Sequence, residues 1–238
     1  MKTKLLGLLA GIGICALAMQ PAAAASISLS TSRSGFDGTL AASAAFITSA
    51  GLLSVTITSG LSPTQIVSAG QAVSDLSFTL SNAPGTLGTT TATGTFATFS
   101  GSDTPTLAPG SPTRWLEAGG QGNFSIVGNT VTLETIGGGQ PSEMILPMGM
   151  TYPAANASIT NGMFSPFVDG PATFMLALSG VTAATTVTSA QFSFGTGPDF
   201  NIPGVPVPGP IVGAGVPGLI AVCGVLFVLA RRRRQLVV

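Results

Sequence analysis

The sequence predicts an all-β protein: an antiparallel β-sandwich of the Greek-key or jelly-roll kind, with an N-terminal signal helix and a C-terminal transmembrane helix. Apolar and polar residues alternate in short stretches through the middle of the chain, as in strands with one buried face. The 32 Gly and 17 Pro residues separate these stretches as turns do. Only 7% of the 238 residues are charged, against about 25% in ordinary soluble domains. This composition favours an exported protein of short strands over a helical bundle.

Residues 1–25 have the three parts of a secretory signal peptide. Lys2 and Lys4 give a positively charged start. Leu5–Met19 is an apolar run, and Ala22–Ala25 supplies the small residues that signal peptidase requires. The run is shorter than the roughly 20 apolar residues of a membrane-spanning helix. We therefore expect transport by the general export machinery and removal of this segment by signal peptidase.

Residues 26–200 form the predicted β domain. In several stretches every second residue is apolar, and we expect these residues to face one shared core. A domain of this length buries a core without the help of disulfide bonds. The expected core residues are Leu53, Val55 and Ile57; Leu76, Phe78 and Leu80; Phe174, Leu176 and Leu178; and Ala190, Phe192 and Phe194.

The clearest local prediction is a β-hairpin that turns at Gly128 and Asn129. A two-residue turn fixes the register of the two strands that flank it. The register passes a consistency test, because apolar residues then face apolar residues and polar residues face polar ones. The expected pairs are Phe124 with Leu133, Ile126 with Val131, Ser125 with Thr132, and Asn123 with Glu134.

The C-terminal part of the chain predicts a membrane span. Residues 201–210 are rich in proline, and we expect a stiff spacer there. Ile211–Ala230 is uncharged and largely apolar, and as a helix it reaches about 30 Å, the thickness of the bilayer hydrocarbon. Glycine and proline weaken this helix as a lasting anchor. The tail, residues 231–238, begins with a basic cluster that holds this end in the cytoplasm, namely Arg231, Arg232, Arg233 and Arg234.

The order of these elements resembles a known sorting signal. The motif Val207, Pro208, Gly209 and Pro210, followed by the apolar span and the arginines, resembles the PEP-CTERM sorting domain of Gram-negative bacteria. It is similar to a variant tail of alphaproteobacterial members, and Gly209 stands where the family usually has Glu. The resemblance implies that an exosortase, an integral membrane protease or transpeptidase, recognises the motif and removes the tail. It also implies an association with exopolysaccharide or biofilm.

Composition excludes several classes of chemistry. The chain has no His, which removes Ser-His and Cys-His catalysis. Cys15 and Cys223 lie in the predicted signal and span, so the β domain has no disulfide. Its basic residues are Arg33 and Arg114 against 8 acidic ones, a balance that repels nucleic acid and anionic polysaccharide. We therefore expect a protein that is not an enzyme, carries no cofactor and binds no nucleic acid.

Two weaker candidates for catalysis and metal binding come from acidic and sulfur-containing residues. A carboxylate pair for glycoside hydrolysis is conceivable among Glu117, Glu134 and Glu143, although we expect Glu134 to be solvated on the polar face of the hairpin. Dispersed acidic residues are compatible with calcium, but no calcium-loop motif is present. A methionine cluster is compatible with copper(I), and core packing is the more common role of such residues; its members are Met144, Met148 and Met150.

Glycan binding depends on exposed aromatic side chains. We take Phe as a core residue, which leaves Arg114 and Trp115 as the segment to consider as a glycan contact. Burial of Trp115 in the core is the more common arrangement.

These observations lead to three functional expectations. The first is a structural, non-enzymatic protein that passes through an inner-membrane intermediate with a periplasmic domain, then reaches the cell envelope or the extracellular space. The second is a calcium- or glycan-binding module with the same sorting signals. The third is a single-pass membrane protein whose tail is never cut.

Overall fold

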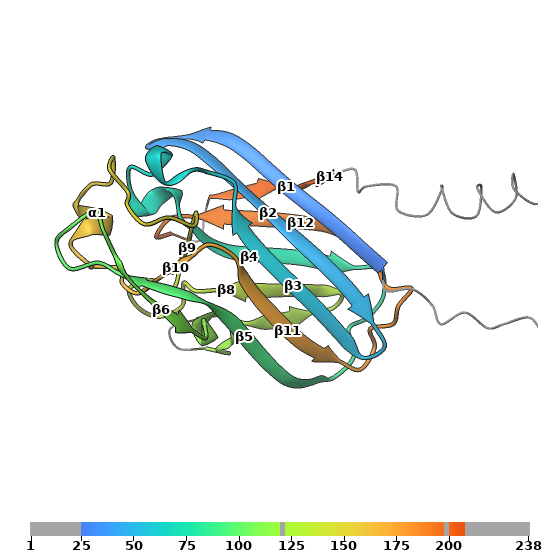
Figure 1. Cartoon of the computed structure of the whole chain (residues 1–238). Coiled ribbons are helices and arrows are strands. Elements are labelled where there is room, and N and C mark those ends of the chain that lie inside the picture. The colour runs from blue at the N-terminus through green and yellow to red at the C-terminus, as the bar shows by residue number, and fades with distance from the viewer. Residues whose placement is uncertain (1–24, 120–121, 198–199, 208–238) are drawn as a thin grey trace, which may run out of the picture.

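The computed structural model describes residues 25–119, 122–197 and 200–207, and about half of them lie in the strands of one large sheet (Figure 1). The expected all-β class is confirmed. The strands of the first half are β1 (Ala25–Gly35), β2 (Gly38–Ser49), β3 (Leu52–Ser59), β4 (Val73–Leu80), β5 (Leu87–Thr98), β6 (Thr106–Gly110) and β7 (Ser125–Val127). Those of the second half are β8 (Thr130–Glu134), β9 (Ile145–Leu146), β10 (Phe167–Asp169), β11 (Ala172–Leu178), β12 (Val187–Phe194), β13 (Asn201–Pro203) and β14 (Val205–Val207).

The helical segments of the described residues are short. They are η1 (Pro63–Gln65), η2 (Ala69–Gln71), η3 (Thr113–Leu116) and α1 (Ala157–Thr160). In these parts of the chain no helix is long and apolar enough to cross a membrane. The predicted signal helix, the predicted transmembrane helix 211–230, Pro208–Pro210 and Arg231–Arg234 lie outside the described residues.

The sheet is mixed. Its strands follow the order β13-β12-β4-β9-β10-β5-β11-β3-β2-β1-β14, with β6 beside β5, β8 beside β4 and β7 beside β8. Neighbouring strands are antiparallel except for β9 and β10, which are parallel, with Ile145 opposite Val168. The prediction of a wholly antiparallel arrangement is therefore wrong at this pair. The long connection between β9 and β10 contains α1. It returns the chain so that β10 runs in the same direction as β9, as a parallel pair requires.

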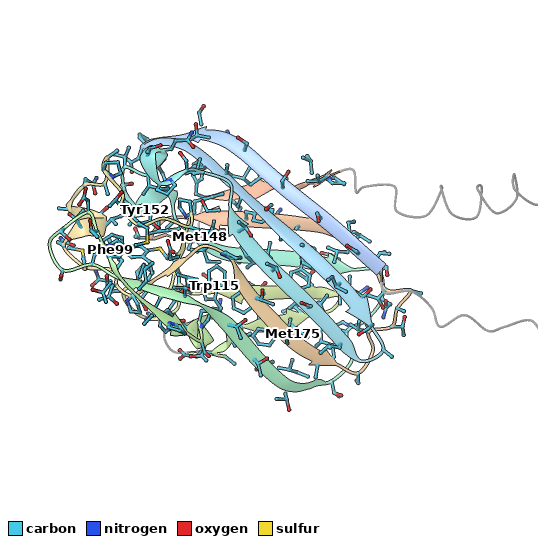
Figure 2. All side chains as sticks on the ribbon, in the orientation of Figure 1. Phe99, Trp115, Met148, Tyr152 and Met175 are labelled. Atoms are coloured by element: carbon cyan, nitrogen blue, oxygen red, sulfur yellow. The ribbon has the colours of Figure 1, made fainter. Side chains whose placement is uncertain are left out.

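One apolar core joins strands that are distant along the sheet. The rings of Phe46 in β2 and Phe78 in β4 lie 5.0 Å apart, although these strands are not neighbours. The sheet therefore curves round on itself (Figure 1). The residues that alternation assigned to the core are all buried, which confirms the predicted faces of β3, β4, β11 and β12. A second apolar cluster, which includes Phe99 and Tyr152, lies towards the end of the domain that carries α1 (Figure 2).

The predicted hairpin is confirmed as β7 and β8. Ser125 lies opposite Thr132 and Ile126 opposite Val131. Gly128 has a φ of 61°, the left-handed conformation that such tight turns use. The register continues beyond β7, where the backbone N–H of Asn123 donates to the carbonyl of Glu134 at 3.0 Å.

Residues 201–207 are part of the domain, so the prediction of a spacer over 201–210 is wrong for this stretch. β13 pairs with β12, with Ile202 opposite Phe192, and β14 pairs with β1, with Val207 opposite Ser28. The two prolines of this stretch lie in the outermost strands of the sheet order, where a missing N–H is tolerated. The first and last described residues, Ala25 and Val207, consequently lie near the same end of β1 (Figure 1).

Candidate functional site

A row of polar side chains crosses four neighbouring strands and includes two buried carboxylates. Asp75 in β4 lies opposite Glu134 in β8 on one side and opposite Ser193 in β12 on the other. Ser193 in turn lies opposite Asn201 in β13, and Asn123 follows Glu134 at the far end. We call this set of five residues the carboxylate row. The flanking asparagines are exposed, so the row is open to solvent at both ends.

Strand pairing brings this row together. In β4, Leu76 and Phe78 face the core, so the alternating residues Asp75 and Ser77 face the other way. Because directly opposite residues in adjacent strands lie about 5 Å apart, the carboxylates of Asp75 and Glu134 become immediate neighbours. Like charges in such positions destabilise a sheet. The charges of Asp75 and Glu134 therefore repel each other when both side chains are ionised.

Both carboxylates are withdrawn from water. Asp75 is 7% exposed and Glu134 6% exposed. The pKa of Asp75 is raised to about 7: burial is the largest cause, the charge of Glu134 also raises it, and the hydrogen bond from Ser193 partly offsets both. Burial also raises the pKa of Glu134, against a hydrogen bond from Asn123 that lowers it. The expectation of a solvated Glu134 is wrong, because the residue is only 6% exposed.

Hydrogen bonds satisfy only part of the row. The side-chain amide of Asn123 donates to Glu134 Oε2 at 2.8 Å. Ser193 Oγ lies 3.1 Å from Asp75 Oδ2 and 2.5 Å from Asn201 Oδ1, yet its hydroxyl carries a single proton. Asp75 Oδ1 is buried and has no hydrogen-bond partner among the residues that the structure describes. The row thus offers more acceptor oxygens than donors, which is the chemistry of a site that takes up a proton or a cation.

The sequence singled out Glu134 but not Asp75 as its partner. Glu143, another residue of the predicted carboxylate pair, is not part of the carboxylate row. Its carboxylate accepts a hydrogen bond from the backbone N–H of Arg114 at 2.9 Å. Burial raises the pKa of Glu143, while Arg114 lowers it. Glu117 is exposed. A non-local strand pairing, which no short motif records, places Asp75 beside Glu134.

The segment proposed as a glycan contact is structural. Trp115, in η3, is 0% exposed, its ring lies 5.5 Å from that of Phe174, and its Nε1 donates to the carbonyl of Glu143 at 2.8 Å. It is central in Figure 2. The guanidinium of Arg114 donates to the carbonyl of Thr135 and to Ser142 Oγ. The burial of Trp115 in the core, the more common of the two expected arrangements, is confirmed, and its ring is therefore not exposed as a glycan platform.

The predicted methionine cluster is divided. Met144 is buried in the second apolar cluster, while Met148 and Met150 are 74% and 73% exposed. Across the described residues, no three or more His, Cys, Asp or Glu side chains are grouped as metal ligands. Any cation in the carboxylate row would have to draw on hydroxyl, amide and water oxygens as well.

A cavity of about 300 Å³ lies at the end of β1 that is farthest from Ala25. Phe36, Phe194 and Phe200 line it together with the carboxylate of Asp37. Phe36 is fully exposed in the turn between β1 and β2, and Asp37 accepts a hydrogen bond from Ser68. The sequence interpretation missed this feature because it assigned phenylalanine to the core.

Comparison of the chain with family models, with curated proteins and with solved structures returns no match.

Proposed function

We propose that this chain is an exported structural protein of the cell envelope or extracellular matrix, not an enzyme, that is sorted through a PEP-CTERM-like tail. In this proposal the β domain is a sandwich of the Greek-key or jelly-roll kind. Signal peptidase removes residues 1–25, and the membrane helix 211–230 with Arg231–Arg234 holds an inner-membrane intermediate. An exosortase-like membrane protease then cuts at Val207–Pro210 and releases the domain to an exopolysaccharide-rich envelope.

The pairing of β14 with β1 is the observation that supports this proposal most. Because Val207 lies opposite Ser28, the two chain ends leave the domain together. A domain with both ends on one side can be held to a membrane there and present its other end outward. Val207, the first residue of the sorting motif, is the last residue that the structure describes and lies in β14.

Cell fractionation of a motif variant tests the proposal. The double variant Pro208→Ala/Pro210→Ala is expected to accumulate as an uncut precursor in the inner membrane, while the unaltered protein appears in the envelope or medium. Pro217→Ala, which alters a proline of the predicted span outside the motif, is the matched control and is expected to be processed. Equal processing of the double variant and the control would reject the sorting function.

Glycan binding is a second candidate function, which the Phe36 cavity favours. Aromatic faces stack on sugar rings, and a carboxylate such as that of Asp37 accepts hydrogen bonds from sugar hydroxyls. The acidic balance of the domain points to a neutral glycan. Phe36→Ser is expected to abolish co-sedimentation with the neutral exopolysaccharide of the producing cell, whereas Val127→Ser, exposed at the other end of the domain, leaves it intact. Equal sedimentation of both variants would reject this candidate.

A further inference from the structure

The carboxylate row lacks a cationic partner. The described residues contain two basic side chains, Arg33 and Arg114. Neither of them lowers the pKa of Asp75, whose environment is set by burial, Glu134 and Ser193. When both carboxylates are ionised, two negative charges therefore lie side by side in a largely buried position with no counter-charge from the described residues.

One oxygen of the carboxylate pair is left without a hydrogen-bond partner among the described residues. Ser193 approaches Asp75 Oδ2 and Asn123 donates to Glu134 Oε2, so each carboxylate has one oxygen oriented by a neighbour. Asp75 Oδ1 is buried without a partner in the described part of the chain. A buried acceptor without a donor destabilises the folded state unless a ligand satisfies it. A cation bound between Asp75 and Glu134 would give this oxygen a partner. It would also offset the repulsion between the two carboxylates.

We propose that Asp75 and Glu134 bind a divalent cation that prefers oxygen ligands, with calcium as the best fit. The side-chain oxygens of Ser193 and Asn123, which flank Asp75 and Glu134, are the neighbouring groups that can complete the shell, together with water. Calcium accepts six to eight oxygen ligands in irregular geometry, whereas magnesium demands a near-ideal octahedron. Zinc prefers nitrogen and sulfur ligands, which this row does not offer. The inference concerns the β domain alone and does not depend on whether the tail is cut.

Calorimetric titration with calcium chloride tests the site on the full chain in detergent at pH 8, where Asp75 is largely ionised. We expect one site with a dissociation constant on the order of 0.1–1 mM, as in extracellular calcium modules. Magnesium chloride is the comparison ion and is expected to bind at least about tenfold more weakly. Lowering the pH to 5 should remove binding, because protons then occupy the row.

Asp75→Asn is the decisive variant, because it removes a ligand and also relieves the charge repulsion, so it is expected to fold. Asp103→Asn, which changes an exposed carboxylate outside the row, is its matched control. With 10 mM calcium the melting temperature of the control should rise by about 3–11 °C, and that of Asp75→Asn should not move. No calcium heat at pH 8, or an equal rise in both variants, would overturn the proposal. A melting temperature that depends on pH but not on calcium would show a proton site only and would overturn it too.

Discussion

Asp75 of β4 lies directly opposite Glu134 of β8, and both residues are less than one-tenth exposed. This pairing sets two acidic groups beside each other on the side of the sheet away from the core. Ser193 and Asn123 each orient one of them, and one oxygen of Asp75 is left without a partner among the described residues. The stability of the domain should therefore depend on what neutralises this pair.

The first prediction concerns pH. Burial raises the pKa of Asp75 from an ordinary value of 3.8 to about 7, so the folded state holds this proton more tightly than the unfolded state does. The stabilisation is fully present below about pH 4 and is lost as the pH rises through 7. Without calcium, the free energy of unfolding should fall by on the order of 4 kcal/mol between pH 4 and pH 8. Urea unfolding followed by circular dichroism measures it.

The same pH series on two variants isolates the cause. Asp75→Asn imitates the protonated side chain and should flatten the dependence, whereas Asp103→Asn should keep it. Glu134 and Glu143, whose pKa values are also raised, should leave a smaller remainder in Asp75→Asn. If the dependence is as large in Asp75→Asn as in Asp103→Asn, the account of the row fails.

The second prediction concerns Trp115. Because its ring is fully buried against Phe174 and its Nε1 is hydrogen-bonded, Trp115→Ala should cost about 3–5 kcal/mol of unfolding free energy. Val127→Ala, at an exposed position of β7, should cost less than about 0.5 kcal/mol. Chemical denaturation of both variants measures the difference. A Trp115→Ala variant as stable as the original chain would contradict the core role and reopen the glycan-contact interpretation.

The third prediction concerns Tyr152, the single tyrosine of the chain. Its hydroxyl lies 2.7 Å from Asp169 Oδ1 and 2.6 Å from the carbonyl of Pro147, and burial with the charge of Asp169 raises its pKa well above the ordinary range. An ultraviolet titration should therefore show no tyrosinate until the protein unfolds in alkali. The chain in denaturant should titrate near pH 10, as a free tyrosine does. Reversible ionisation near pH 10 in the folded protein would contradict this hydrogen-bonded burial.

The fourth prediction tests the extension of the domain beyond residue 200. Ile202 is 5% exposed in β13, so Ile202→Ala should lower the free energy of unfolding by about 2–4 kcal/mol. Val205→Ala in β14, 61% exposed, is the control and should change little. A spacer would tolerate both changes. Equal stability of the two variants would restore the spacer interpretation.

Local patterns predicted much of this fold. The alternation of Leu53, Val55 and Ile57 identified a buried face because a strand repeats every two residues. The register of the hairpin at Gly128 and Asn129 could be predicted because a two-residue turn determines which residues of the two strands lie opposite each other. The strands at 201–207 were missed because their prolines disfavour central strands, while edge strands accept them.

The candidate site was much less predictable than the strands. Asp75 and Glu134 are distant in the chain, and only the pairing of β4 with β8 reveals them as neighbours. Phe36 was missed because its hydrophobicity suggested the core. Its position between Gly35 and the Asp37–Gly38 pair is that of a hairpin tip, and this was the one local signal for its exposure.

The central claim is that the tail is a sorting signal and not a lasting anchor. Mass spectrometry of the protein recovered from the envelope or medium of the producing cell tests it most directly. The account predicts a C-terminus within Val207–Pro210 and no peptide from Leu219–Arg231. Mature protein that always retains these peptides and remains in the inner membrane would contradict it.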